Sequence, residues 1–87
     1  MIKIYWKPGC KYCDLAKSFL FERKIEYKLI QLGEDISVEY FKLLNPGIKT
    51  VPAIFIDEIF IGGYEDLVRE YENDKERFTG ITKKADL

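Results

Sequence analysis

Two spacings of apolar residues divide the first part of the chain into a strand and a helix. The apolar-rich run over residues 2–6 predicts a short strand, which ends at the turn signal of residues 7–9. Apolar residues then recur at the spacing of one helical face, which predicts a helix over about residues 11–24. The members of this predicted buried stripe are Tyr12, Leu15, Ala16, Phe19 and Leu20.

A second strand is predicted over residues 25–32, where apolar and polar side chains alternate imperfectly. Because a strand, a helix and a strand follow one another closely, they should form a right-handed βαβ unit with parallel strands. Ser37 or Asp35 can cap the helix that comes next, and Asn45-Pro46-Gly47 ends it. The apolar residues of this second helix are Tyr40, Phe41 and Leu44.

Two β-rich runs in the second half of the chain predict a hairpin. They cover residues 53–56 and 59–61, and Asp57-Glu58 separates them. Asp-Glu is not a favoured two-residue turn, so we expect the connection to use a looser loop. Gly62-Gly63 ends the second strand of the hairpin.

A last helix is predicted from Tyr64 to about Phe78. Its periodic apolar residues are Tyr64, Leu67, Val68 and Tyr71. Residues 79–87 are polar and show no period, so we expect a single domain over residues 1–78 and a loosely held tail over residues 79–87.

The predicted order of elements is β-α-β-α-β-β-α, which belongs to the α/β class. A βαβ half followed by a ββα half gives a four-stranded mixed sheet with helices on both faces. This arrangement is similar to the thioredoxin-like fold.

Composition limits the kinds of partner that the chain can have. Its 87 residues form one small domain, and 47% of them are hydrophobic, which is enough for a core. A formal net charge of −1 argues against binding to nucleic acid. No apolar run is long enough to span a membrane, and the first residues do not look like a secretory signal. We therefore expect a cytoplasmic protein that binds neither nucleic acid nor membrane. We also expect it to be a monomer.

The candidate chemistry lies in the two cysteines, Cys10 and Cys13, because the chain has no histidine. The pair stands where the first turn enters the first predicted helix. The free N–H groups and partial positive charge of a helix start favour a thiolate, and Lys7 and Lys11 add positive charge nearby. Cys10, at the cap, should be the nucleophile, and Cys13 the thiol that resolves the mixed disulfide.

Other roles for the cysteine pair are a zinc site, a structural disulfide or two inert thiols. Zinc needs four ligands, which two cysteines supply only with help from a dimer or from nearby carboxylates. A disulfide that closes so short a loop would add little stability, by about 2 kcal/mol on the loop-entropy model. Reversible redox exchange explains the spacing and the position best.

Two further segments each allow a structural and a functional interpretation. Thr50-Val51-Pro52 comes just before the third strand, where proline is common at a strand start. A cis Val51–Pro52 bond would turn the backbone of Val51 outward for an incoming peptide, although most such bonds are trans. Gly62-Gly63-Tyr64-Glu65-Asp66 can be an ordinary strand end and helix start, with carboxylates that suit the helix dipole.

Three motifs together resemble the dithiol glutaredoxins over about residues 2–77. They are Lys7-Pro8-Gly9-Cys10-Lys11-Tyr12-Cys13, Thr50-Val51-Pro52 with Ile54-Phe55-Ile56, and Ile61-Gly62-Gly63-Tyr64 with Asp66. The resemblance implies an oxidoreductase that reduces protein disulfides and glutathione-mixed disulfides through a reversible Cys10–Cys13 disulfide. Glutathione would be the reductant and co-substrate, and no metal is expected.

The resemblance also implies roles for residues around the cysteines. Lys7 would meet a carboxylate of glutathione, and Tyr12 would border the binding groove. Val51 would pair its backbone with the cysteinyl part of the tripeptide, beside a cis Pro52 and next to Thr50.

The γ-glutamyl end of glutathione would lie against Gly63, Tyr64 and Asp66. Asp66 would take the amine, and helix N–H groups would take the carboxylate. Two departures from the family pattern stand out. Lys11 replaces the proline that is commonest between the cysteines, and Ala53 replaces a polar residue that many relatives carry after the proline.

Two alternatives keep the same residues but change the function. One is a glutaredoxin-like electron donor to ribonucleotide reductase that is itself reduced by thioredoxin reductase. The other is a dimer that carries an iron–sulfur cluster on two Cys10 thiolates and two glutathiones.

Overall fold

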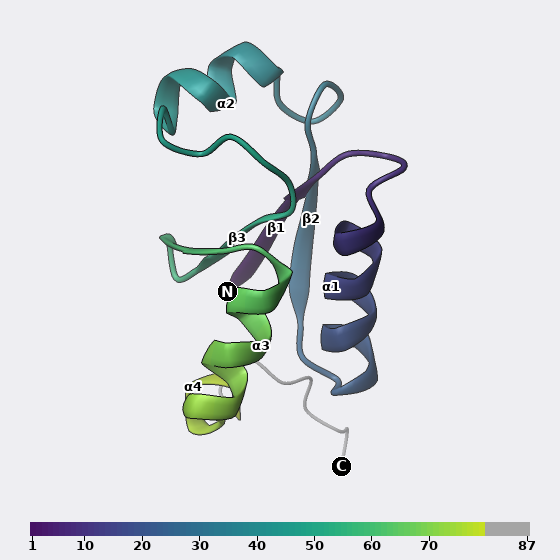
Figure 1. Cartoon of the computed structure of the whole chain (residues 1–87), viewed down its shortest axis with the longest axis vertical. Helices are drawn as coiled ribbons and strands as arrows, with labels where there is room; N and C mark the ends of the chain where they lie inside the picture. The colour runs from purple at the N-terminus through teal and green to yellow at the C-terminus, as the bar shows by residue number, and fades with distance from the viewer. Residues whose placement is uncertain (80–87) are drawn as a thin grey trace.

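The computed structural model describes residues 1–79, which form a four-stranded mixed sheet with helices on both faces (Figure 1). The predicted α/β, thioredoxin-like fold is confirmed. The strands are β1 (Ile2–Trp6), β2 (Tyr27–Gln31), β3 (Ala53–Ile56) and β4 (Ile59–Gly62). The helices are α1 (Lys11–Glu22), α2 (Val38–Leu44), α3 (Tyr64–Asn73) and α4 (Glu76–Thr79).

The strand order in the sheet is β2-β1-β3-β4. β1 is parallel to β2, with Ile4 opposite Leu29, and antiparallel to β3, with Ile4 opposite Ile54. β4 completes the sheet as an antiparallel neighbour of β3. The predicted βαβ unit and the predicted hairpin are therefore both present, and β1 and β3 are the central strands.

Each face of the sheet has its own apolar cluster. On one face α1, α3 and α4 pack against Ile2, Ile4, Ile54 and Ile56, all of which are fully buried. On the other face α2 contributes Phe41, which packs with Tyr5 at a ring-centroid distance of 4.7 Å. Figure 1 shows α1 lying alongside the sheet and α2 at the end of the molecule farthest from α3 and α4. Among residues 1–79 no helix has the length and hydrophobicity that a membrane crossing requires.

The buried face of α1 differs from the predicted stripe in its first turns. Ala16, Phe19 and Leu20 are buried as predicted, but Tyr12 is 51% exposed and Leu15 is 36% exposed. Cys13 takes the inward position of the first turn and is completely buried. A cysteine that packs as a small apolar residue rotates the buried stripe away from Tyr12, which is freed for the surface.

The second helix also buries less than predicted. Ser37 is its N-cap, and its hydroxyl oxygen accepts a hydrogen bond from the Tyr40 N–H at 3.0 Å, which confirms one of the two proposed caps. Of the three apolar residues assigned to the helix only Phe41 is buried, whereas Tyr40 and Leu44 are exposed. The helix has only 7 residues, so it packs on the sheet mainly through Phe41, with Val38 partly buried against the same cluster.

The hairpin between β3 and β4 is tighter than expected. Ile56 is paired with Ile59, so Asp57 and Glu58 form a two-residue turn, with φ of 50° and 70°. This left-handed pair matches the twist of the flanking strands, which is why turns of this kind join hairpins. An ion pair from Lys3 to Glu58, 2.7 Å long, ties the turn to β1. The expected looser loop was wrong.

The last predicted helix is interrupted before its end. α3 ends at Asn73, and the side chain of Asp74 then accepts a hydrogen bond from the Arg77 N–H at 3.2 Å, which caps the short α4. The break lets the chain turn back, so that Phe78 is fully buried against the core. Asn73-Asp74 was the sequence signal for this interruption. The predicted tail lies outside the described residues except for Thr79, which ends α4.

Candidate active site

Cys10 is the N-cap of α1, as its place in the sequence predicts. Its backbone is extended, and its Sγ accepts a hydrogen bond from the Cys13 N–H at 3.1 Å. The two cysteines are joined by a disulfide, with Cα atoms 5.2 Å apart. In the reduced state the same N–H and the helix dipole would favour the thiolate of Cys10.

The two sulfurs differ in access. Cys10 is half-buried, whereas Cys13 is completely buried under the first turn of α1. An incoming sulfur therefore reaches Cys10 first, and Cys13 is placed to attack Cys10 from within. This asymmetry is what the assignment of nucleophile and resolving thiol requires.

The segment before β3 comes close to Cys10. The Val51–Pro52 peptide bond is cis. The carbonyl oxygen of Val51 lies 3.7 Å from the Sγ of Cys10. Val51 stands outside the β ladder, which begins with Ala53 opposite Tyr5, so its backbone borders the reactive sulfur without being part of the sheet.

An open groove of about 480 Å³ runs beside the cysteine pair. The rings of Tyr12 and Tyr64 lie on it, with centroids 6.3 Å apart. The groove brings together every residue predicted for glutathione binding except Lys7, and Glu65 also lines it. Its lining residues are Tyr12, Thr50, Val51, Pro52, Gly63, Tyr64, Glu65 and Asp66.

Lys7 lies on the other side of the Thr50–Val51 segment. There it lines a separate hollow together with residues of α2 and of the loop that follows it. Because Thr50 and Val51 line both the groove and this hollow, Lys7 is a neighbour of the groove and not part of its wall.

Asp66 holds the start of α3 in place. One carboxylate oxygen accepts a hydrogen bond from the Gly63 N–H at 3.0 Å, and the other is paired with Arg69. The Gly63 N–H in first place, followed by Arg69, holds the pKa of Asp66 below its usual value against partial burial. Gly62 has a φ of 123°, and a Cβ there would collide with the Asp66 carboxylate. The glycine is thus required by the capping carboxylate as well as by its backbone conformation.

The lowered pKa of Asp66 predicts how the stability of the protein depends on pH. A carboxyl group with a folded-state pKa below its unfolded value stabilises the fold above the unfolded pKa, and this contribution is lost as pH falls through the folded value. Asp66→Asn should therefore lower the free energy of unfolding near neutral pH, by less than about 1 kcal/mol because the side chain is partly exposed. Urea denaturation at neutral pH and below pH 3 measures the difference, which should shrink in acid.

Glu72→Gln is the matched control for this prediction, since Glu72 is an exposed acid on the same helix. It should leave stability unchanged at both pH values. A difference between wild type and Asp66→Asn that stayed constant with pH would show that the carboxylate charge does not support the helix start.

Among residues 1–79, no group of three or more cysteine, histidine or acidic side chains is arranged to hold a metal ion. The site consists of the Cys10–Cys13 pair at the start of α1, the backbone of Val51 beside Cys10, and the adjacent groove. A thioredoxin-like fold with a redox-active dithiol at the start of α1 defines the class of thiol–disulfide oxidoreductases.

Comparison with known proteins identifies the family within this class. The family model "Glutaredoxin" matches residues 2–61, and the chain belongs to the glutaredoxin family. It is 40% identical over 79 residues to "Glutaredoxin 1" of Rickettsia bellii, a match that covers 86% of this chain and 78% of the relative. It is 33% identical over 79 residues to "Glutaredoxin-2, mitochondrial" of Rattus norvegicus, covering 85% of this chain and 49% of the rat protein.

Solved structures show the same fold. The crystal structure of glutaredoxin 1 from Francisella tularensis, complexed with cacodylate, is 29% identical, with a TM-score of 0.69. That match covers 86% of this chain and 95% of the Francisella chain. A buckwheat glutaredoxin–glutathione complex has a TM-score of 0.76 at 22% identity and covers 94% of this chain and 81% of its own. The chain is thus a glutaredoxin-type thiol–disulfide oxidoreductase.

Proposed function

We propose that this glutaredoxin uses glutathione as its reductant and acts on glutathione-mixed disulfides and protein disulfides. The observation that carries the proposal is the groove beside Cys10, because it gathers seven residues that glutathione recognition predicts from three separate segments of the chain. The buckwheat glutaredoxin, which has the same fold, was crystallised as a complex with glutathione.

The chemistry of the groove suits an extended tripeptide with two carboxylates and one amine. The backbone of Val51 can pair with the cysteinyl part, which sets its sulfur near Cys10. Asp66 offers a carboxylate to the amine, and the N–H groups at the start of α3 suit the neighbouring carboxylate. Lys7, which lines the hollow on the other side of Val51, would pair with the carboxylate at the glycine end.

The proposed reaction on a mixed disulfide has two exchange steps. The Cys10 thiolate attacks the glutathione sulfur, the disulfide bond breaks, and the substrate leaves as a thiolate. A second glutathione thiolate then attacks the Cys10-bound glutathione, which releases oxidised glutathione and restores the Cys10 thiolate. With a protein disulfide, Cys13 instead attacks Cys10, so that the substrate leaves reduced and the Cys10–Cys13 disulfide forms.

The source of electrons separates this proposal from its nearest alternative. We expect glutathione to reduce the oxidised protein completely, and thioredoxin reductase with NADPH to reduce it much more slowly. Quenching both reactions over time and counting alkylated thiols by mass spectrometry measures the two rates. Rapid reduction by the reductase together with no reduction by glutathione would contradict the proposal and favour a reductase-fed electron donor.

The ribonucleotide reductase partner, the monomeric state and the cytoplasmic location stay predictions. They do not enter the steps above, which need only glutathione and a disulfide substrate.

A further inference from the structure

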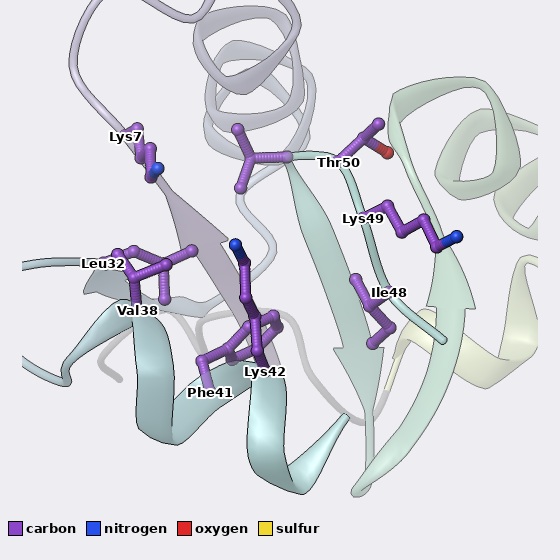
Figure 2. Close-up of a pocket in the computed structure, with 9 residues that line it drawn as sticks. Lys7, Leu32, Val38, Phe41, Lys42, Ile48, Lys49 and Thr50 are labelled. Carbon is purple, nitrogen blue, oxygen red and sulfur yellow. The ribbon is translucent and has the colours of Figure 1, made fainter. Parts of the chain in front are cut away.

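A second hollow lies next to the glutathione groove, across the Thr50–Val51 segment. It is formed between that segment, the end of β2 and the helix α2 (Figure 2). Its volume is about 100 Å³, and its floor is apolar. The apolar side chains that line the floor are Leu32, Val38, Phe41, Ile48 and Val51.

Three lysines, Lys7, Lys42 and Lys49, stand around this apolar floor, and none of the nine lining residues is acidic. In the part of the chain that the structure describes, no carboxylate lies within ion-pairing distance of these lysines. Figure 2 shows the side chains of Lys7 and Lys42 extending into the same space above Phe41, with Lys49 directed to the other side of Ile48. In a chain with a net charge of −1, this is a local concentration of unpaired positive charge.

Glutathione binding does not account for the whole hollow. Of the three lysines, the proposed glutathione site uses only Lys7, at the glycine end of the tripeptide. Lys42 and Lys49 have no role in glutathione binding, and neither have the apolar side chains of Leu32, Val38, Phe41 and Ile48. A hollow of this volume can accept one aliphatic side chain. Glutathione ends at its glycine, so it has no further residue whose side chain could fill the hollow.

The hollow is continuous with the reacting centre through Val51. The carbonyl oxygen of Val51 lies 3.7 Å from the Cys10 Sγ, and Val51 also lines the hollow. An extended peptide that pairs with the backbone of Val51 and brings a disulfide sulfur to Cys10 therefore continues over the hollow. Side chains along such a peptide alternate between the surface and solvent, so one of them can enter it.

We propose that this hollow is a docking site for protein-disulfide substrates that carry an acidic, extended segment with one aliphatic side chain next to the reacting cysteine. The aliphatic side chain enters the hollow, and neighbouring Asp or Glu carboxylates pair with Lys42 and Lys49. This inference rests on the proposed reduction of protein disulfides and specifies which of them are preferred.

The reaction at this site needs no glutathione. The Cys10 thiolate attacks one sulfur of the substrate disulfide, and the other sulfur leaves as a thiolate. Cys13 then attacks Cys10, which releases the reduced substrate and leaves the Cys10–Cys13 disulfide. Two electrons pass from the protein dithiol to the substrate disulfide, so a single turnover can be measured with the reduced protein alone.

The test uses synthetic peptides that share one disulfide loop and differ only in the residues beside it. One peptide carries glutamates and a leucine, the second lysines and the same leucine, and the third the glutamates with glycine in place of leucine. The reduced protein should react with the first peptide about tenfold faster than with the second at low salt, and the advantage should shrink as salt is raised. The third peptide should also react more slowly than the first, because nothing fills the hollow.

The variant Lys42→Glu/Lys49→Glu should remove the preference for the acidic peptide. It should leave the glutathione-dependent reduction of a small mixed disulfide, that of hydroxyethyl disulfide with glutathione, at its wild-type rate. Lys28→Glu/Lys75→Glu makes the same charge change on exposed lysines that do not line the hollow, and it should keep the preference. Circular dichroism during thermal unfolding confirms that both variants are folded.

Equal rates for all three peptides would overturn the docking site. So would an equal loss of the preference in the two double variants, since that would show a general charge effect. A fall in small mixed-disulfide activity confined to Lys42→Glu/Lys49→Glu would assign these lysines to glutathione and would also refute the proposal. Failure of oxidised protein to accept electrons from glutathione would contradict the proposed reductant but would not affect the peptide preference.

Discussion

Cys10→Ser is expected to abolish deglutathionylation, with a loss in rate of about a thousandfold or more, as for other enzymes that lose their nucleophile. The Sγ of Cys10 is the sulfur at the cap of α1 that borders the groove, and a serine hydroxyl stays protonated there at neutral pH. The assay couples release of oxidised glutathione from a glutathionylated peptide to glutathione reductase and NADPH. Activity should fall to the level without enzyme.

Cys13→Ser is the matched variant, because it removes the other sulfur of the same pair. It should retain deglutathionylation, since that reaction uses only Cys10 and a second glutathione. It should lose the reduction of peptide disulfides, because the mixed disulfide on Cys10 then has no resolving thiol. The assignment would be contradicted by substantial activity in Cys10→Ser, or by complete loss of deglutathionylation in a folded Cys13→Ser.

Phe78→Ala is expected to lower the free energy of unfolding by about 3–5 kcal/mol. Phe78 is fully buried in the cluster with Leu67 and the central strands, and its ring packs edge-on to Tyr71 at a centroid distance of 5.3 Å. Small domains have total stabilities of about 5–15 kcal/mol, so the variant should be close to unfolding at room temperature. Urea denaturation followed by circular dichroism measures the change.

Phe21→Ala is the control for this prediction, because it deletes the same ring from a position that is 72% exposed. It should change stability by no more than about 0.5 kcal/mol. Equal, small effects of both substitutions would show that α4 does not belong to the folded core. The outcome therefore tests the predicted domain boundary near residue 78, which places Phe78 inside the domain.

Local patterns in the sequence were sufficient to predict most of the fold. The strand at residues 2–6, the helix starting after Cys10 and the cap at Ser37 each depend on residues a few positions apart, and each is present. The predictions of the hairpin loop and of the end of the last helix were wrong because other interactions outweighed the local sequence pattern. Asp57-Glu58 forms a tight turn because the flanking strands and the Lys3 ion pair hold it, and Asp74 ends α3 because its side chain caps α4.

The sequence predicted which residues gather near the cysteines better than it predicted how those residues are arranged in space. The periodicity of α1 places Tyr12 in the core, and only the resemblance to glutaredoxins places it at a groove, where the structure has it. The cis state of the Val51–Pro52 bond was one of two open possibilities. Lys7 was expected to join the groove residues, and the structure places it in the neighbouring hollow instead.

By itself the sequence determined the order of the elements and the dithiol at the start of the first helix, because both depend on contacts between near neighbours along the chain. Only the tertiary structure decided that Val51 lies beside Cys10, and that Lys7, Lys42 and Lys49 line one hollow. The physical reason is that most of these distances join segments far apart in sequence. They are set by how α1, α2 and the loop before β3 pack on one sheet.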